Sequence, residues 1–426
     1  MKEDFLHYLW KYQKFSTINF HTTQGETVQV LKVGSHNTQP AGPDFSVAQL
    51  IINNQKWAGN VEIHIKSSDW YAHNHQTDTN YDSVILHVVW EYDVDVYRPN
   101  NTKIPILELK TYVSAEALNK YQQLYSNNKG RWINCENQIN DVSDFVWANW
   151  LERLYFERLE EKCKPISALL QTNKNNWEAT CFCLIAKAFG GNTNGDAFFK
   201  MSQSIPFTII QKERSVFKLE ALFMGQANLL NENADDSYEK LLYNEYFYLK
   251  KKYKLIAPIG VKVQFYRLRP PNFPTIRLSQ LAVLYVKNND LFNILNTTKT
   301  IEDYNNILCL QASEFWDTHY NFGHVNKISA KKITSSFVGV ILLNSVLPLR
   351  FLYLKSKDDI SVGMDDLLTI IALIVPEKNS LVNKYSKAGV KVTSALHSQA
   401  LLTLHKNYCV VGKCLRCSIG ASLLGS

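Results

Sequence analysis

Residues 42–66 are GPDFSVAQLIINNQKWAGNVEIHIK, and two β-like runs, Phe45–Asn53 and Trp57–Lys66, fill most of this stretch. Both runs are rich in Val, Ile and aromatic residues, which favour strands. Asn54, Gln55 and Lys56 separate the runs. A short polar break between two such runs predicts a hairpin, so we expect two neighbouring antiparallel strands here.

Polar and apolar side chains alternate along the second run. Successive side chains of a strand point to opposite faces. One face therefore receives three apolar side chains and the other three polar ones: Val61, Ile63 and Ile65 against Glu62, His64 and Lys66. The alternative to a functional site is that these three polar residues form the solvated face of an amphipathic strand.

Asp44 comes directly before the first run, which places two carboxylates on adjacent strands beside a nitrogen base. Carboxylates bind Mg²⁺ or Mn²⁺, and such an ion lowers the pKa of a bound water and stabilises a leaving oxyanion. A neighbouring base orients the water or donates to the developing charge. The pattern predicts Asp44, Glu62, His64 and Lys66 as catalytic residues, with the two acids as metal ligands.

The pattern changes on either side of this hairpin. A short helix is expected at residues 5–15, further strands at Thr27–Val33, Ser83–Tyr92 and Ile104–Lys110, and a turn at Asn127–Gly130. Helical spacing follows from Trp147 onwards, with helices expected at 177–189, 216–230, 236–252, 275–286, 330–346, 364–375 and 392–405. This order predicts an α+β fold: a mixed-sheet domain at 1–130, a helical domain at 131–330, and a helical domain at 331–426 that ends in a Cys-rich metal module.

A second group of candidate ligands lies in His73-Asn-His75-Gln-Thr-Asp78, with His87 in the next expected strand. Two His residues in an HxH pattern followed by Asp form a plausible transition-metal set. The segment joins strands that flank Glu62, so it is also placed to complete the site there. The alternatives are a polar loop that uses His for hydrogen bonds, and a cupin-like barrel, which the long helical remainder argues against.

The third group is Cys-rich, with three cysteines within nine residues: Cys409, Cys414 and Cys417. Without a secretory signal this spacing is typical of thiolate metal ligands rather than disulfides. Tetrahedral Zn²⁺ needs a fourth ligand, and His405 and His397 are near in sequence. An iron–sulfur cluster completed by the distant Cys135 is a second interpretation. Three buried cysteines acting as small apolar side chains are the third.

Charge is unevenly distributed along the chain. The net charge is +7, while residues 1–130 hold 11 Lys and Arg against 13 Asp and Glu, and residues 377–426 hold 7 against 1. A basic tail suits an anionic partner, nucleic acid first, although solubility alone explains it equally well. The residues expected to contact nucleic acid are Arg267, Arg269, Arg277, Lys406, Lys413 and Arg416. For Arg277 an internal ion pair is the favoured alternative.

Composition excludes several classes of protein. The start MKEDFLHYLW lacks the long apolar run of a secretory signal, and the apolar run around Phe337–Leu354 is interrupted by Asn344, Pro348 and Arg350. We therefore expect a cytoplasmic protein without a membrane span. The 22 Tyr, 21 Phe and 9 Trp supply enough apolar surface to exclude general disorder.

The arrangement of Asp44 and Glu62 resembles the PD-(D/E)xK nuclease superfamily. In that superfamily a helix precedes a hairpin whose first strand opens with Asp and whose second strand carries Glu-x-Lys. His64 departs from the pattern, because it stands where the lysine is expected, and Lys66 follows two residues later. The resemblance implies a metal-dependent nuclease acting on nucleic acid phosphodiesters.

Nearly the whole chain is also similar to an uncharacterised bacterial family of unknown function. The stretches that carry this similarity are AGPDF, GNVEIHIKSSDW with HNH, LHVVWEYD, EALFMGQANLL, RLRPPNFPTIRLSQLA and YCVVGKCLRCSIG. This similarity implies no activity. Two further hypotheses therefore stay open beside the nuclease: a non-catalytic nucleic-acid-binding or adaptor protein with a degenerate nuclease fold, and a small-molecule metalloenzyme that uses His73 and His75.

Overall fold

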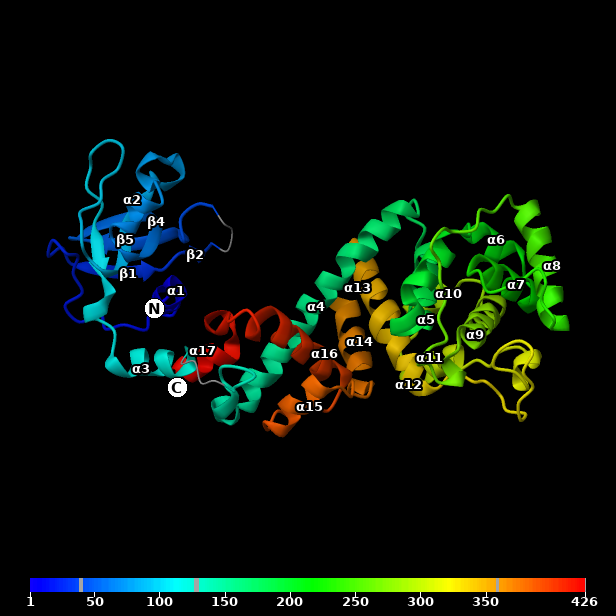
Figure 1. Cartoon of the computed structure of the whole chain (residues 1–426). Helices are drawn as coiled ribbons and strands as arrows, with labels where there is room; N and C mark the ends of the chain where they lie inside the picture. Colours follow the sequence, from blue (N-terminus) through cyan, green and yellow to red (C-terminus); the bar gives the residue numbers. More distant parts are fainter. Residues whose placement is uncertain (38–40, 126–129, 358–359, 426) are drawn as a thin grey trace. The chain divides into compact units, whose positions relative to one another are not determined.

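The computed structural model describes residues 1–37, 41–125, 130–357 and 360–425 (Figure 1). Contacts divide the chain into two compact units: unit 1 comprises Met1–Trp150, Lys384–Val390 and Leu402–Ser426, and unit 2 comprises Leu151–Asn383 and Lys391–Leu401. These units group the chain differently from the three segments expected from sequence, because part of the C-terminal segment belongs with the N-terminal sheet. The turn expected at Asn127–Gly130 falls mostly on residues outside the described ranges.

Unit 1 contains a mixed sheet of six strands. The order is β1-β3-β4-β5-β6, with β2 also paired to β3. Pairs among β1 to β4 are antiparallel, while β4–β5 and β5–β6 are parallel. The strands are β1 (Val28–Lys32), β2 (Ser35–His36), β3 (Phe45–Ile52), β4 (Gln55–Lys66), β5 (Val84–Glu91) and β6 (Ile106–Glu108). A mixed sheet followed by many helices confirms the expected α+β class.

The hairpin between β3 and β4 turns more tightly than its sequence suggested. Ile52 pairs with Gln55, so the loop is Asn53-Asn54. Both asparagines have positive φ, 49° and 64°. This is the conformation of a type I′ turn, which Asn tolerates well and which matches the twist of the strands. The turn places the start of β3 opposite the part of β4 that carries Glu62.

The part of β4 from Val61 to His64 is buried on both faces. Val61 and Ile63 are 0% and 1% exposed, and Glu62 and His64 on the opposite face are only 5% and 2% exposed. The interpretation of Glu62 and His64 as a solvated strand face is therefore wrong. Helix α1 (Glu3–Lys11) packs against β4, and so does the short helix α2 (Asp69–Ala72). Strands of parallel pairs are commonly covered on both sides in this way.

Helices make up most of the remaining chain. Unit 1 also holds α3 (Ala115–Tyr125) and α17 (Ser418–Gly425), and α4 (Asp144–Thr172) crosses the division at Trp150. The helices that follow α4 are α5 (Trp177–Gln203), α6 (Phe207–Lys212), α7 (Val216–Gln226), α8 (Ser237–Lys252), α9 (Pro274–Lys287), α10 (Leu291–Thr297), α11 (Ile301–Leu308), α12 (Ser335–Ile341), α13 (Leu347–Ser356), α14 (Ile360–Leu373), α15 (Ser380–Lys387) and α16 (Ala395–Leu404). Most of the helices expected from sequence lie within a few residues of these.

Among the described residues, one helical stretch, Ser335–Ser356, is long and apolar enough to cross a membrane by length and composition. Of its most apolar window, 61% is buried inside the protein. Core helices pass the same test, and Lys162 donates through Nζ to the carbonyl oxygen of Leu343 at 2.8 Å. The stretch contains a π-helical turn at Leu342–Val346 directly before α13, where Pro348 cannot donate to the helix ladder.

Candidate functional site

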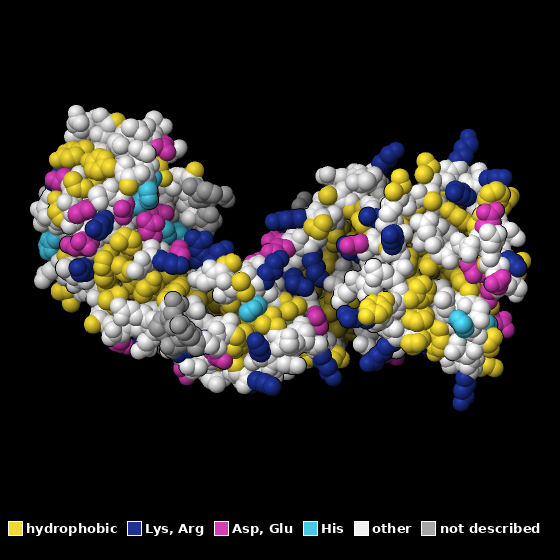
Figure 2. All heavy atoms as spheres, in the orientation of Figure 1, with side chains coloured by type: hydrophobic (Ala, Val, Ile, Leu, Met, Phe, Trp, Pro, Cys, Tyr) yellow, Lys and Arg dark blue, Asp and Glu magenta, His cyan; other side chains and the backbone are white. Residues whose placement is uncertain are grey.

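Four side-chain atoms converge on the covered face of β4. His64 Nε2 lies 3.0 Å from His73 Nδ1 and 3.6 Å from Glu62 Oε1, and His75 Nε2 lies 3.4 Å from the same glutamate oxygen. The ligand atoms of His64, His73 and His75 all lie within 4.8 Å of one another. Figure 2 shows histidine and acidic side chains gathered side by side on the sheet-bearing part of unit 1. We call Glu62, His64, His73 and His75 the histidine–glutamate cluster.

The backbone after β4 explains how two histidines separated by one residue reach the same point. His73 ends α2, and His75 begins a single 3₁₀ turn, His75–Thr77. Between them Asn74 has φ 59° and ψ 30°, the left-handed conformation that asparagine tolerates better than most residues. This local reversal brings His73 to His64 and His75 to Glu62.

His87 supports the cluster from β5. Its position is set by the parallel register, in which His87 is the partner of Glu62. His87 Nε2 lies 2.8 Å from His64 Nδ1, and His87 itself is fully buried. A His64 ring that donates from Nδ1 to His87 keeps its Nε2 lone pair directed at the cluster. A hydrogen bond of this kind orients a metal-binding histidine.

The side chains of Asp44 and Glu62 each accept a hydrogen bond from a backbone N–H of the neighbouring strand segment. The backbone N–H of Asp44 donates to Glu62 Oε2 at 3.1 Å, and the N–H of Ile63 donates to Asp44 Oδ2 at 3.0 Å. His7 of α1 adds a contact, with Nε2 3.2 Å from Asp44 Oδ2. The structure thus brings together Asp44, Glu62 and His64, as expected from sequence, and adds His7 to them.

Burial sets the protonation of these groups. Burial, followed by the nearby Asp44 charge, raises the pKa of Glu62 to about 9. Burial and the neighbouring imidazoles lower the pKa of His64 to about 2, and burial lowers the pKa of His87 to about 3. For His7, burial lowers the pKa, but the hydrogen bond and charge of Asp44 outweigh it and raise the pKa. At neutral pH the imidazoles of His64 and His87 are therefore neutral, the form that binds metals, and Glu62 is protonated until a bound cation displaces its proton.

Three imidazole nitrogens within 4.8 Å of one another could hold a single transition-metal ion, and Glu62 Oε1 lies near two of them, those of His64 and His75. Nitrogen and oxygen ligands bind Zn²⁺ at about 2.0–2.2 Å, which sets the ligand atoms of a tetrahedral site roughly 3.3–3.6 Å apart. The measured separations of 3.0, 3.4 and 3.6 Å are close to these values. A ligand set dominated by imidazole suits Zn²⁺ or Fe²⁺ best, and among the oxygen-preferring ions the transition metal Mn²⁺ suits it better than Mg²⁺. His73 is exposed, so one side of the cluster is open to solvent.

Two other residues expected at this site have different positions. Lys66 is exposed at the end of β4, where its N–H donates to Asp69 and its charge acts on Asp93. Asp78 caps a short 3₁₀ turn, and its Oδ1 accepts from the backbone N–H of Asn80 at 2.9 Å. The group of ligand atoms that lie within 4.8 Å of one another consists of His64, His73 and His75, and Glu62 joins it only through its contacts with His64 and His75.

The basic residues expected to contact nucleic acid fall into both units. Arg267 and Arg269 are exposed in unit 2. Arg277 is only 8% exposed; its guanidinium lies over the Phe337 ring, 3.7 Å from the centroid, and donates to Gln280 and Asn272. The described contacts of Arg277 are thus an aromatic ring and two amides, rather than the acid expected for an internal ion pair. Because a buried guanidinium offers little surface to a phosphate backbone, the structure gives Arg277 an internal role.

Three basic side chains of the C-terminal segment are exposed in unit 1: Lys406, Lys413 and Arg416. Arg416 reaches the N-terminal helix, where its Nη2 lies 3.7 Å from Asp4 Oδ1. Its charge also contributes to the lowered pKa of His36, after burial and the charges of His7 and Lys11. The basic segment is therefore part of the same unit as the acidic site.

The C-terminal cysteines line a small cavity together with Cys135. His405, expected as a zinc ligand, does not line this cavity; its ring lies 5.9 Å from that of Trp132. His397 belongs to unit 2 and contacts Thr393. The structure therefore brings Cys135, rather than either histidine, to the three clustered cysteines.

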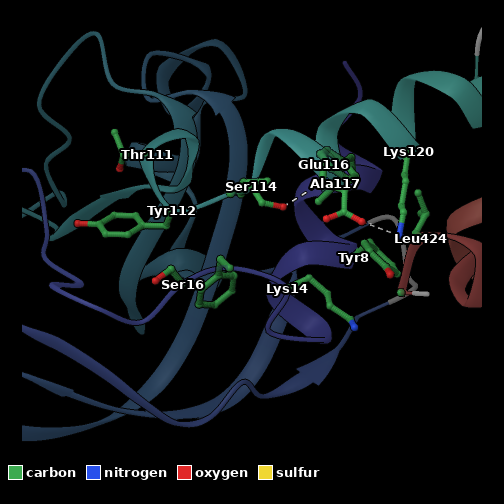
Figure 3. A pocket seen from close by; sticks show the side chains of 14 residues that line it. Tyr8, Lys14, Ser16, Thr111, Tyr112, Ser114, Glu116, Ala117, Lys120 and Leu424 are labelled. Carbon is green, nitrogen blue, oxygen red and sulfur yellow. Dashed lines mark hydrogen bonds and ion pairs between the residues drawn. The ribbon is translucent and has the colours of Figure 1, made fainter.

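A larger, open pocket of about 620 Å³ lies between α1, the loop 111–114, α3 and α17 (Figure 3). Glu116 and Lys120 line it and form an ion pair at 3.1 Å, so its acid is already neutralised. Tyr8 and Leu424 from opposite ends of the chain line it together. None of the residues expected at the metal site lines this pocket.

Sequence patterns alone did not single out His7. It is a lone histidine among apolar residues of α1, and only its contact with Asp44 gives it a place at the site. The sequence offers only a weak signal for His7. It is a titratable side chain on the apolar side of an amphipathic helix, and the chain also has an acidic residue at the start of a predicted strand.

Comparison with known proteins gives a family but no activity. No curated protein and no solved structure matches the chain. The model of a family described as a protein of unknown function (DUF2851) matches residues 3–380. The match covers the whole histidine–glutamate cluster and stops before the three C-terminal cysteines. The chain belongs to the DUF2851 family.

Proposed function

We propose that this protein is a metal-dependent phosphodiesterase of the nuclease type. The observation that carries the proposal is the convergence of Glu62 Oε1, His64 Nε2, His73 Nδ1 and His75 Nε2 on one point beside Asp44. A divalent ion held there would polarise a phosphate ester and lower the pKa of a coordinated water.

Burial supports a cation as the missing partner of this cluster. Glu62 is 5% exposed and His64 is 2% exposed, and the atoms through which they meet His73 and His75 are all nitrogen or oxygen atoms that can bind a metal. A cation bound there would compensate for the burial of these polar groups. We propose Mn²⁺ rather than Mg²⁺, because three of the four ligands are imidazole nitrogens.

Phosphodiesters are the proposed substrate class for two reasons. The order of elements, a helix, antiparallel strands, and then a strand parallel to β4, agrees with the nuclease-like arrangement inferred from Asp44 and Glu62. Exposed basic side chains, including Arg416, lie in the same unit and can attract a phosphate backbone. Cytoplasmic localisation and nucleic acid as partner are parts of this proposal.

The chain's own residues have separable roles in the proposed reaction. Asp44, held by the N–H of Ile63 and contacted by His7, is placed to orient an attacking water beside the ion. His87 fixes the orientation of His64. Lys66 is assigned no catalytic role in this scheme, because its side chain is exposed at the end of the strand.

The test is cleavage of labelled single- and double-stranded DNA and RNA by protein stripped of metal and then supplied with Mn²⁺, Mg²⁺ or Zn²⁺. We expect Mn²⁺ to restore most activity, and Asp44→Ala and His73→Ala to abolish it. His324→Ala, at an exposed histidine of unit 2, is the matched control and should cleave normally. Cleavage that survives His73→Ala, or that needs no metal, would overturn the proposal.

A second candidate function is supported by the aromatic side of the cluster. Tyr81 stacks on His75 with ring centroids 3.7 Å apart, and the buried Trp70 lies 5.4 Å from the same imidazole. Aromatic rings beside a metal would suit a small partly apolar substrate of a metalloenzyme, although both rings here belong to a buried hydrophobic cluster. Hydrolysis of small phosphodiesters or esters without any cleavage or binding of nucleic acid would favour this function. Binding of nucleic acid without cleavage would instead favour an adaptor.

A further inference from the structure

Four cysteines from distant parts of the chain surround one small cavity in unit 1. Cys135 comes just before a 3₁₀ helix at Glu136–Asp141, and the other three belong to the C-terminal segment: Cys409, Cys414 and Cys417. Leu124, Asn134, Tyr408 and Gly420 complete the lining. All four thiols are free of disulfide bonds. We call them the four-cysteine site.

Hydrogen-bond donors are directed at these sulfurs. Asn134 donates from Nδ2 to Cys414 Sγ at 3.3 Å, and the Tyr385 hydroxyl lies 3.4 Å from Cys409 Sγ. The backbone N–H groups of Ile419 and Gly420 are directed at Cys417. Cysteines that act only as small apolar side chains need no donors, whereas N–H···S contacts stabilise thiolates bound to metal and tune clusters.

The local backbone around Cys414 also leaves no room for larger side chains. A Cβ built on Gly420 would lie 2.2 Å from the carbonyl oxygen of Cys414. Gly420 is therefore required for the close approach of α17 to the turn that carries Cys414 and Cys417. The chain is bent tightly at this point, and the result is that three sulfurs face Cys135 across the cavity.

The spread of the sulfurs distinguishes a single ion from a cluster. Four thiolates on one Zn²⁺ lie about 3.8 Å apart, because each Zn–S bond is about 2.3 Å long in a tetrahedron. Among the residues that the structure describes, the ligand atoms of His64, His73 and His75 all lie within 4.8 Å of one another. No three of the four cysteine sulfurs lie that close together. An iron–sulfur cubane holds its cysteines farther apart, since each thiolate binds a different iron atom.

We propose that Cys135, Cys409, Cys414 and Cys417 hold a [4Fe–4S] cluster. The cluster joins the segment after α3 to the C-terminal turn and α17, and so fastens the C-terminal segment to unit 1. It is independent of the proposed phosphodiesterase activity, because the histidine–glutamate cluster shares no residue with it.

The experiment is anaerobic purification of the full chain, with reconstitution by iron and sulfide where the protein emerges colourless. We expect a brown protein with about four irons and four acid-labile sulfides per chain, and a Mössbauer spectrum of a cubane cluster. Cys135→Ser and Cys414→Ser should each lose the visible band and most of the iron. Cys309→Ser, at a half-buried cysteine of unit 2, should keep both.

The measurements on the unmodified protein decide the matter even where a serine variant fails to fold. A colourless protein with one zinc per chain that does not take up iron would overturn the cluster in favour of a single ion. A protein that binds neither metal would overturn it in favour of buried thiols. Nuclease activity is not read out here, so a failure of the proposed function leaves this test unaffected.

Discussion

Two glutamates of this protein have the same burial and opposite electrostatics. Glu62 in unit 1 and Glu213 in unit 2 are each 5% exposed. Burial and the Asp44 charge raise the pKa of Glu62 to about 9. Burial also raises the pKa of Glu213, but hydrogen bonds from Lys252, Tyr253 and Lys218 outweigh it and lower the pKa to about 2.

The difference lies in what faces the carboxylate. Lys252 and Tyr253 donate to Glu213 Oε1 at 2.7 and 2.6 Å, and Lys218 donates to Oε2 at 3.0 Å. Glu62 accepts one backbone N–H, and its other oxygen faces two imidazoles whose pKa values are lowered. A buried acid with its own cations has a structural role, whereas a buried acid beside neutral imidazoles is suited to lose its proton to a cation bound from solution.

Replacing each glutamate by glutamine tests this difference, and the largest expected effect is the loss of activity in Glu62→Gln. Glu62→Gln removes the carboxyl group that would lose its proton to the ion while keeping the shape, so metal binding should weaken and cleavage should fall by about 10⁴-fold, as for groups that act as a unit. The measurement is cleavage rate together with bound Mn²⁺ by calorimetry. Glu213→Gln should bind metal normally. Equal losses of metal binding and cleavage in both variants would show that Glu62 has no special role as a metal ligand.

For stability we expect the opposite order: Glu213→Gln should destabilise the protein and Glu62→Gln should not. Glu213→Gln should lower the free energy of unfolding at pH 7 by about 1–2 kcal/mol, less than the full linkage value of its lowered pKa, because Lys218 and Lys252 are 38% and 39% exposed and solvent screens their charges. Glu62→Gln should not lower the stability of the metal-free protein, because it removes a carboxyl group that burial disfavours as a charge.

The contribution of Glu213 to stability depends on pH. A carboxyl with a lowered folded pKa contributes stability that is fully present above pH 4.5 and is lost as the pH falls through about 2. The deficit of Glu213→Gln should therefore be constant from pH 7 to 5 and shrink below pH 4.5 in denaturant unfolding. Glu160→Gln, at an exposed acid whose Oε1 lies 3.5 Å from Lys355 Nζ, is the control and should change stability little at any pH.

A smaller effect on metal affinity is expected from replacing His87, which contacts His64 from β5. His87→Phe keeps a ring beside Trp70 but removes the nitrogen that lies 2.8 Å from His64 Nδ1. Loss of such an orienting contact typically weakens metal affinity about 10- to 100-fold. Titration with Mn²⁺ measures it, with His324→Phe as control. Unchanged affinity would mean that His64 needs no orientation by β5.

The smallest expected effect is on the salt dependence of nucleic-acid binding. Replacing Lys406, Lys413 and Arg416 with Ala should weaken binding across all sequences and reduce the slope of log K against log salt by roughly one unit per lost phosphate contact. The matched control replaces three exposed lysines of unit 2: Lys174, Lys262 and Lys327. An unchanged slope in the first variant would remove the C-terminal segment from the model of binding.

Most of the secondary structure could be predicted from local patterns. The strands at 45–52 and 55–66, the helix at 237–252 and the mixed sheet followed by helices all lie close to where periodicity placed them. The expected helix at 330–346 differs, since the structure starts it at Ser335 and gives it a π-helical turn at Leu342–Val346. Periodicity does not predict an extra residue inserted into a turn, because the insertion depends on contacts such as that of Lys162.

The sequence alone determined which side chains of β4 share a face and that a tight turn precedes them, since strand alternation and turn chemistry are local properties. It also determined that His73, His75 and three cysteines are close in the chain. Only the tertiary structure decided that His7 meets Asp44, that His87 holds His64, and that Cys135 faces Cys414. These contacts join segments far apart in sequence, where no periodic pattern relates one residue to the other, so they depend on how helices and strands pack.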